Sequence, residues 1–279
     1  MSEFVHDGNR IAYEVHGEGP DVTVLLPGLL FSSRMQFPLA RSLAKRGHRV
    51  ITMDPLGHGD SDRPADMWRY SMTAFGEQVI GLLDHLEIDR AVVGGTSLGA
   101  NVTLEVAALA PDRLRGMVIE MPVLDNALLG CAIAFAPLLV GLTFGEPLMR
   151  GVQRAANLVP RGAVPFLPRL ALDWIGQDPK PSAALLQGLF FGEVAPHRSV
   201  RRTFEAPALI IGHPRDPVHP FSDADMLAHE LPNARLVNAS SILELRLTPS
   251  RLTAVIGDFV DECRQTSTPA AVRRRAASA

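Results

Sequence analysis

Hydrophobic and polar residues follow two alternating patterns along the first part of the chain. Residues 10–16 alternate between apolar and polar side chains, as in a half-buried strand, whereas residues 22–26 and 49–53 are largely apolar, as in strands buried on both faces. Between these buried runs, residues 32–46 carry apolar side chains at helical spacing. The order strand, helix, strand predicts a βαβ unit of a parallel sheet.

The same alternation continues along the chain with one interruption. Further strands are predicted at residues 91–95, 117–121, 208–211 and 234–238, and further helices at residues 73–86, 97–109, 222–230 and 249–263. This pattern predicts an α/β fold with a doubly wound, mostly parallel sheet, built from residues 1–121 and 208–264. Residues 122–207 are rich in Pro and Gly and carry helical apolar stretches, so we expect them to form a helical cap over the carboxyl edge of the sheet.

One stretch of the predicted cap is long enough to raise the question of a membrane span. Residues 127–149 contain a single charged side chain, Glu146. Pro137, Pro147 and three glycines interrupt the stretch, and α/β patterns flank it on both sides, so we expect cap helices and no stable membrane span. Residues 265–279 are rich in Ser, Thr, Pro, Ala and Arg, and we expect them to be a disordered tail.

Composition narrows the classes of partner. Of the 279 residues, 47% are hydrophobic and the net charge is −3, which excludes a largely disordered chain and gives no basic face for nucleic acid. Cys131 and Cys263 form neither a disulfide framework nor a cluster with metal-ligand spacing, so we expect no metal and no cofactor. Residues 1–10 lack a hydrophobic signal segment, so we expect a cytoplasmic protein. The near-neutral charge favours a small, neutral or weakly charged ligand, and we expect a small hydrophobic molecule as the partner. Composition does not distinguish a monomer from a homodimer.

The strongest motif is Gly-Thr-Ser-Leu-Gly at residues 95–99. It follows the buried run at residues 91–93 and opens an apolar helix, as a G-x-S-x-G nucleophile elbow does. In such an elbow, small residues two positions either side of the serine permit a tight strand-to-helix turn that exposes the hydroxyl above the sheet. The motif therefore predicts Ser97 as a nucleophile.

With the elbow in this context, the chain resembles the α/β-hydrolase fold superfamily over residues 13–260. Residues 54–61 are similar to the family's D-x-x-G-x-G-x-S loop, and residues 26–29 fall where the family has its His-Gly oxyanion loop, with Pro27 in place of the histidine. The resemblance implies an α/β-hydrolase type sheet with a cap and an esterase-like activity. Family members that open epoxides or displace halide use an aspartate at the elbow, whereas this chain has Ser97.

The resemblance also implies further site residues. Asp216 lies at the position of the triad acid, after a buried strand, although an aspartate before Pro217 is also a common turn former. The backbone N–H groups of Leu29 and Leu98 fall at the positions of the oxyanion donors.

The family pattern breaks at the base. The order nucleophile, acid, histidine requires a histidine in the loop after residues 234–238, but Ser241 stands there and no histidine follows His229. A serine hydroxyl is not a base near neutral pH. Loss of one triad member usually leaves only about 10³ to 10⁴ of acceleration over water.

Three hypotheses follow from the missing histidine. In the first, another histidine is the base: His219, three residues after Asp216, is the leading candidate, with His213 and His197 behind it. The protein would then hydrolyse a small or medium hydrophobic ester, thioester or amide through Ser97, as an enzyme with an atypical triad.

The second hypothesis is a pseudoenzyme or binding protein that holds a small hydrophobic ligand under the cap. In the third, Ser97 acts with water or a substrate group as proton acceptor, and Glu120 and Glu244 are spare carboxylates. Glu120 ends a predicted strand, where ligands bind in parallel sheets. Together with Phe135 and Phe144 from the cap, Glu120 is our predicted substrate-binding set.

Overall fold

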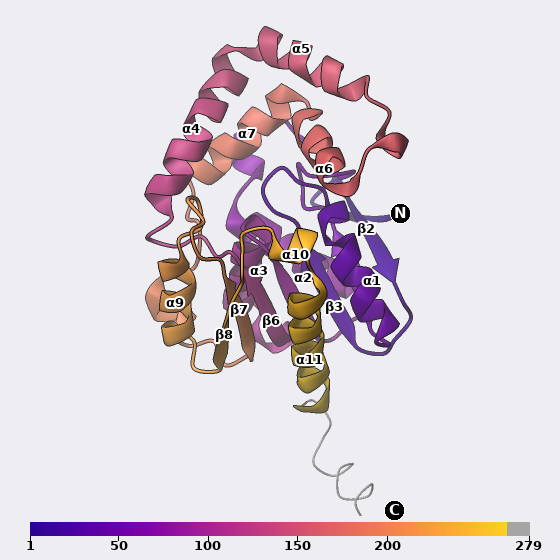
Figure 1. Cartoon of the computed structure of the whole chain (residues 1–279), viewed down its shortest axis with the longest axis vertical. Coiled ribbons are helices and arrows are strands. Elements are labelled where there is room, and N and C mark those ends of the chain that lie inside the picture. Colours follow the sequence, from indigo (N-terminus) through magenta and orange to yellow (C-terminus); the bar gives the residue numbers. More distant parts are fainter. Residues whose placement is uncertain (267–279) are drawn as a thin grey trace, which may run out of the picture.

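A computed structural model describes residues 1–266 and contains an eight-stranded, mostly parallel sheet (Figure 1). The strands, in the spatial order β1-β2-β4-β3-β5-β6-β7-β8, are β1 (Ser2–His6), β2 (Asn9–His16), β4 (Arg49–Met53), β3 (Val22–Leu26), β5 (Ala91–Thr96), β6 (Leu114–Glu120), β7 (Ala208–Gly212) and β8 (Ala234–Asn238). Only the β1–β2 and β2–β4 pairs are antiparallel. The predicted α/β fold with a doubly wound sheet is confirmed.

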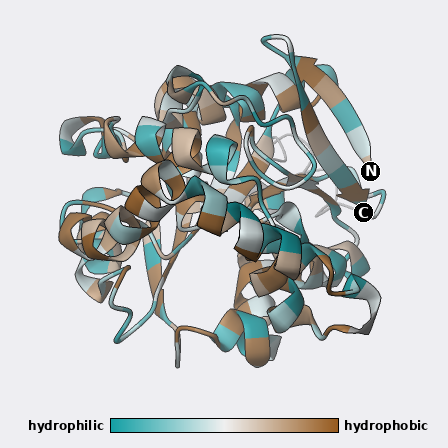
Figure 2. Cartoon of the chain, turned by 90° about the horizontal axis from the view of Figure 1, so that it is seen from above, coloured by the Kyte–Doolittle hydropathy of each residue, from teal (hydrophilic) through white to brown (hydrophobic). Residues whose placement is uncertain are grey.

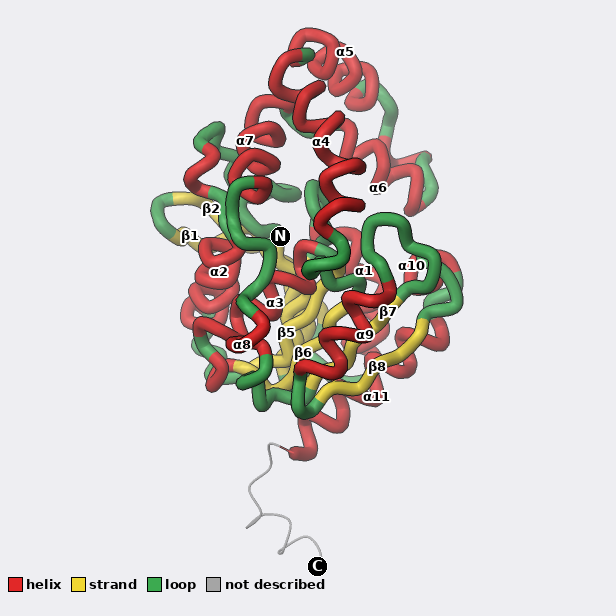
Figure 3. Tube along the Cα trace, turned by 90° about the vertical axis from the view of Figure 1, so that its left-hand side faces the viewer, coloured by secondary structure: helices red, strands yellow, loops and turns green. Residues whose placement is uncertain are grey.

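Helices cover both faces of the sheet (Figure 3). On one face lie α1 (Phe37–Lys45) and α11 (Ser250–Thr266), and on the other lie α2 (Met72–His85), α3 (Leu98–Leu109) and α9 (Phe221–Glu230). Successive residues of β3 point to opposite faces of the sheet. Val24 packs with the α2/α3 layer, and Leu25 packs with the α1/α11 layer. This explains why the central strands are apolar throughout.

The described chain also contains short turns of helix. They are the helices α8 (Arg198–Arg201) and α10 (Glu244–Leu247), and the 3₁₀ helices η1 (Ser33–Gln36), η2 (Met67–Arg69), η3 (Pro111–Arg113) and η4 (Arg161–Ala163).

The edge strand β1 was not predicted from the pattern. It forms a hairpin with β2 through Asp7 and Gly8, which both have positive φ angles. Only Phe4 of this strand is buried, and its neighbour Val5 is 70% exposed. A five-residue strand with one buried apolar side chain gives too weak an alternation to be recognised.

Four helices between β6 and β7 lie across the carboxyl end of the sheet. They are α4 (Leu128–Phe144), α5 (Glu146–Asn157), α6 (Phe166–Ile175) and α7 (Pro179–Phe190). Seen from above, this layer spans the top of the core and mixes hydrophobic with polar residues (Figure 2). The predicted helical insertion is therefore present, whereas its limits as a separate domain, residues 122–207, stay a prediction.

The long apolar stretch at residues 127–149 is divided at Gly145. Within residues 1–266, no single helix is long and apolar enough to cross a membrane. The pair α4 and α5 passes a test of length and composition together, but it is bent by 101°. At the other end of the chain, α11 continues to Thr266, and residues 267–279 of the expected tail lie outside the described residues.

Candidate active site

Ser97 occupies a strained turn between β5 and α3. Its backbone has φ 54° and ψ −110°, which is unfavourable for a residue with a side chain. Close packing at the two flanking glycines holds this turn: a Cβ on Gly95 would lie 2.6 Å from the Gly99 carbonyl carbon, and one on Gly99 would lie 2.7 Å from the Leu26 oxygen. The turn places the hydroxyl at the carboxyl end of the sheet, beneath the cap.

His219 lies within hydrogen-bonding distance of this hydroxyl. Its Nε2 is 2.8 Å from Ser97 Oγ, and its Nδ1 is 2.9 Å from Asp216 Oδ2. With Nδ1 donating to the carboxylate, Nε2 is free to accept the serine proton. The three side chains therefore form one continuous hydrogen-bonded line.

The spacing of only three residues between acid and imidazole works because Asp216 has two separate tasks. Its Oδ1 accepts the N–H groups of Val218 and His219 at 2.9 and 3.0 Å, which closes a turn and leaves Oδ2 for the ring. Burial raises the pKa of Asp216, but the hydrogen bonds from His219 outweigh this effect and the pKa is lowered. Turn former and imidazole partner, treated as alternatives above, are combined in one carboxylate.

The other histidines considered as bases lie elsewhere. His213 is buried, with Nδ1 donating to the Ser241 carbonyl oxygen at 2.9 Å and Nε2 lying 3.3 Å from Glu120 Oε1. His197 caps the short helix α8, bonds Ser199 and is exposed. Neither ring contacts the Ser97 hydroxyl.

The two backbone groups assigned to the oxyanion lie beside Ser97. Leu29 lies in the loop after β3, next to Leu30 with φ 62°, and Leu98 is the first residue of α3. In the described chain, neither N–H is among the donors of turn, loop and helix-end hydrogen bonds. The oxyanion role of both N–H groups stays a prediction.

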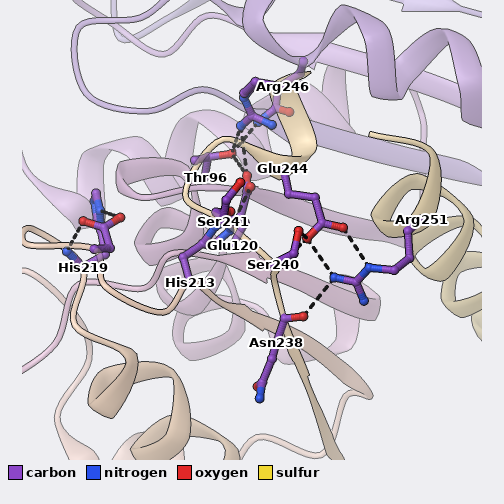
Figure 4. A network of polar contacts seen from close by, with 12 residues as sticks. Thr96, Glu120, His213, His219, Asn238, Ser240, Ser241, Glu244, Arg246 and Arg251 are labelled. Atoms are coloured by element: carbon purple, nitrogen blue, oxygen red, sulfur yellow. Dashed lines mark hydrogen bonds and ion pairs between the residues drawn. The ribbon is translucent and has the colours of Figure 1, made fainter. Parts of the chain in front are cut away.

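Glu120 lies directly under the elbow in a buried charge cluster (Figure 4). Its carboxylate accepts from Arg246 at 2.9 Å and from the Thr96 hydroxyl, and it faces His213. Burial raises the pKa of Glu120, but the Arg246 charge and His213 outweigh it and hold the pKa at about 2. For His213 the two effects have the opposite signs. Burial lowers the pKa of its imidazole, but the hydrogen bond and charge of Glu120 outweigh burial and the pKa is raised.

The carboxylate of Glu244, the other candidate proton acceptor, is also held by hydrogen bonds. Glu244 accepts from Arg251 at 2.8 Å and from the Ser240 backbone and hydroxyl, and these contacts, the Arg251 hydrogen bond first, lower its pKa to about 2. A carboxylate of such low pKa is a weak base. Both Glu120 and Glu244 are therefore poorly suited to accept a proton from Ser97, and Ser241 contributes only its carbonyl to this region.

Two apolar cavities meet at Ser97. One has a volume of about 270 Å³ and the other about 520 Å³, and both are lined by Ser97, Leu29 and Phe135. Glu120 lines the larger cavity. Phe144, the last residue of α4, is 84% exposed and lines neither cavity, so its expected role stays a prediction that these cavities do not support.

Comparison with known proteins shows what parts of the chain are similar to. A family model described as alpha/beta hydrolase fold matches residues 22–139. The chain is 38% identical over 105 residues to 2-hydroxymuconate semialdehyde hydrolase of Pseudomonas sp. (strain CF600), covering 38% of this chain and 34% of that protein. It is 31% identical over 115 residues to bifunctional epoxide hydrolase 2 of Rattus norvegicus, covering 40% and 20%. The matched segment thus spans about a third or less of these relatives.

Solved structures extend the likeness over nearly the whole chain. The enol-lactonase from Burkholderia xenovorans LB400 superposes with a TM-score of 0.75 at 22% identity, covering 93% of this chain and 100% of that one. A thermophilic esterase from Thermogutta terrifontis gives 0.72 at 18% identity, covering 94% and 97%. The chain therefore has the fold of the α/β hydrolases, and its residues 22–139 match the model of that family.

Proposed function

We propose that this protein is a serine hydrolase that cleaves a small or medium hydrophobic ester or thioester, with Ser97 as nucleophile, His219 as base and Asp216 as the acid that orients it. One observation carries the proposal: the unbroken line of hydrogen bonds from Asp216 through His219 to Ser97, at 2.9 and 2.8 Å. This order of groups is the one that activates a serine hydroxyl.

In the first half of the reaction, Ser97 Oγ attacks the carbonyl carbon while its proton passes to His219 Nε2. The carbonyl oxygen becomes an oxyanion and accepts hydrogen bonds from the N–H groups of Leu29 and Leu98. Asp216 stabilises the imidazolium through Nδ1–H and keeps its own charge. When the intermediate collapses, the bond to the leaving oxygen or sulfur breaks, and His219 returns the proton to that atom.

In the second half, water attacks the acyl group held on Ser97. His219 accepts one proton of the water, the bond from the acyl carbon to Ser97 Oγ breaks, and the proton returns to Oγ. The product is a carboxylic acid, and the three side chains recover their starting states. No step uses Ser241, where the family places its histidine.

The cavities support a hydrophobic substrate. Their walls are mainly aliphatic and aromatic side chains, and the charged groups of the larger cavity, Glu120 and Arg246, are paired with each other. A small-molecule site of this kind gains its affinity from apolar burial and its orientation from a few polar groups.

The test is labelling with a fluorophosphonate probe, which reports an activated serine without a known substrate. We expect rapid labelling of the wild type, none of Ser97→Ala, and strongly slowed labelling of His219→Ala, with His197→Ala as the matched control that labels normally. A folded wild type that does not label would overturn the proposal and favour the ligand-binding protein, the second candidate, for which Ser241 at the family's histidine position is the motivating feature.

A further inference from the structure

The two cavities that meet at Ser97 differ in their contact with the imidazole. The smaller one, about 270 Å³, is lined by Leu98, Val123, Leu128, Ala132, Leu186 and Phe190 among others, and His219 is not part of its wall. The larger one, about 520 Å³, is lined by Met35, Leu170, Trp174, Ile242, Arg246 and His219. Because only one cavity touches the proton donor, the two sides of a bound ester are not equivalent.

We propose that the larger cavity holds the leaving group and the smaller cavity holds the acyl group of the substrate. This assignment rests on the proposed function, since it uses His219 as the acid that protonates the leaving atom. It adds the substrate class: an ester or thioester with an uncharged, compact acyl group and a larger hydrophobic alcohol or thiol.

The assignment follows from the four bonds of the tetrahedral intermediate. One goes to Ser97 Oγ, and one to the oxyanion, which points to the N–H groups of Leu29 and Leu98. The leaving oxygen or sulfur must lie within hydrogen-bonding distance of His219 Nε2 to receive its proton. The group attached to that atom therefore continues along the wall that His219 forms, and the acyl chain takes the fourth direction, into the other cavity.

The walls of the acyl cavity fix the chemistry of its occupant. Its polar side chains are satisfied or neutral: Asn101 Nδ2 donates to the carbonyls of Val123 and Val194, and burial raises the pKa of the Cys131 thiol to about 11. An acyl group with a second carboxylate would find no cationic partner there and would lose its hydration. The acyl cavity therefore selects an uncharged aliphatic or aromatic acid.

The leaving-group cavity is larger and reaches the surface. Leu170 and Trp174 of α6 line it from the cap, and Ile242 and Leu243 from the loop after β8 are each about two-fifths exposed at its rim, 41% and 42%. The acyl cavity also has partly exposed wall residues, Leu128 at 48% and Phe190 at 42%, so exposure does not separate the two cavities. Their volumes do, because the leaving-group cavity holds about 520 Å³ and the acyl cavity about 270 Å³. Tolerance to chain length should therefore be asymmetric.

Two series of esters test the assignment on the wild-type protein. In one series the acyl chain lengthens on a fixed ethyl alcohol, and in the other the alcohol lengthens on a fixed acetyl group. We expect kcat/KM to fall at a shorter chain length in the acyl series than in the alcohol series. The opposite order, or equal cut-offs, would overturn the assignment without needing any variant.

A matched pair of cap variants sharpens the test. Ala132 lines only the acyl cavity and Ala171 only the leaving-group cavity, and both lie on cap helices, α4 and α6. Ala132→Phe should reduce kcat/KM for longer acyl chains roughly tenfold or more relative to the acetyl ester, and Ala171→Phe should do the same for longer alcohols relative to ethyl. Exchanged effects would reject the assignment.

Failure of the assignment and failure of the proposed function give different results. If Ser97 takes the fluorophosphonate label and esters are cleaved, but the length preferences are reversed, only the cavity assignment is wrong. If Ser97 does not label in a folded protein and neither series is cleaved, the hydrolase proposal and the assignment fall together.

Discussion

Asp216→Asn separates the two tasks of the Asp216 carboxylate in the loop after β7. The asparagine oxygen can still accept the N–H groups of Val218 and His219, so the turn is retained. Its amide NH₂, however, replaces the oxygen that faces His219 Nδ1 at 2.9 Å. Because an NH₂ group donates, Nδ1 becomes the acceptor and the ring proton moves to Nε2, which then cannot take the proton of Ser97.

The change of tautomer determines the size of the expected effect. A wrong tautomer in this type of triad costs about 10⁴ in kcat, or about 5 kcal/mol of transition-state stabilisation. We therefore expect Asp216→Asn to lose about 10⁴ in kcat with an almost unchanged free energy of unfolding. Asp216→Ala should lose similar activity and also about 1–3 kcal/mol of stability, because it removes the turn hydrogen bonds as well.

The assay combines hydrolysis of a short nitrophenyl ester with urea unfolding of each variant. Asp225→Asn, on the exposed side of α9, is the matched control for the chemical change alone and should retain full activity. A folded Asp216→Asn protein that keeps kcat within about tenfold of the wild type would refute the assignment of Asp216 as the partner of the imidazole.

Three further predictions follow from the site. His219→Ala should reduce kcat about 10⁴-fold or more in the same ester assay, and a loss below tenfold would reject it as the base. For Glu120, whose pKa of about 2 lies below its usual 4.5, the stabilising ion pair is present above about pH 4.5 and is lost as the pH falls toward 2. Glu120→Gln should therefore lower the free energy of unfolding by about 3–5 kcal/mol near neutral pH and reduce its fall at acid pH. Urea unfolding at several pH values measures both effects, and a variant with the wild-type pH dependence would contradict the reasoning. Gly99→Ala should destabilise the protein by about 1–3 kcal/mol and reduce fluorophosphonate labelling of Ser97, because its Cβ would lie 2.7–2.8 Å from three atoms of Leu26 and Pro27. Gly151→Ala is the matched control, since a Cβ there meets nothing within 4 Å, and it should stabilise by about 0.5–1 kcal/mol in the same unfolding assay.

Much of the fold was predictable because each buried strand and amphipathic helix has a local signature. The apolar run before residues 95–99 and the glycines around Ser97 are close in sequence, so their pattern identified the elbow directly. The hairpin strand β1 lacked such a signature, since only Phe4 of its five residues is buried. The exposure of Phe144 was not predictable, because helical spacing alone does not reveal the 101° bend between α4 and α5 at Gly145.

The charge cluster under the elbow could not be predicted from sequence. Its members, Glu120, His213 and Arg246, come from the end of β6, the loop after β7 and the helix after β8, and only the packing of the sheet brings them together. The short spacing between Asp216 and His219 was visible in the sequence. What was not visible is that the carboxylate closes the turn with one oxygen and leaves the other for the ring.

The position of Asp216 and His219 in one loop, between β7 and α9, affects how chains of this fold are classified from sequence. The loop after β8 takes no part in proton transfer in the proposed reaction. Its Ser240 hydrogen-bonds to Glu244 of α10, which in turn pairs with Arg251 of α11. A survey that discards superfamily members without a histidine after the last strand would class this chain as inactive. If the proposed reaction holds, the pattern Asp-x-x-His in the loop after β7, together with a Gly-x-Ser-x-Gly elbow, is a second signature by which chains of this kind can be sought.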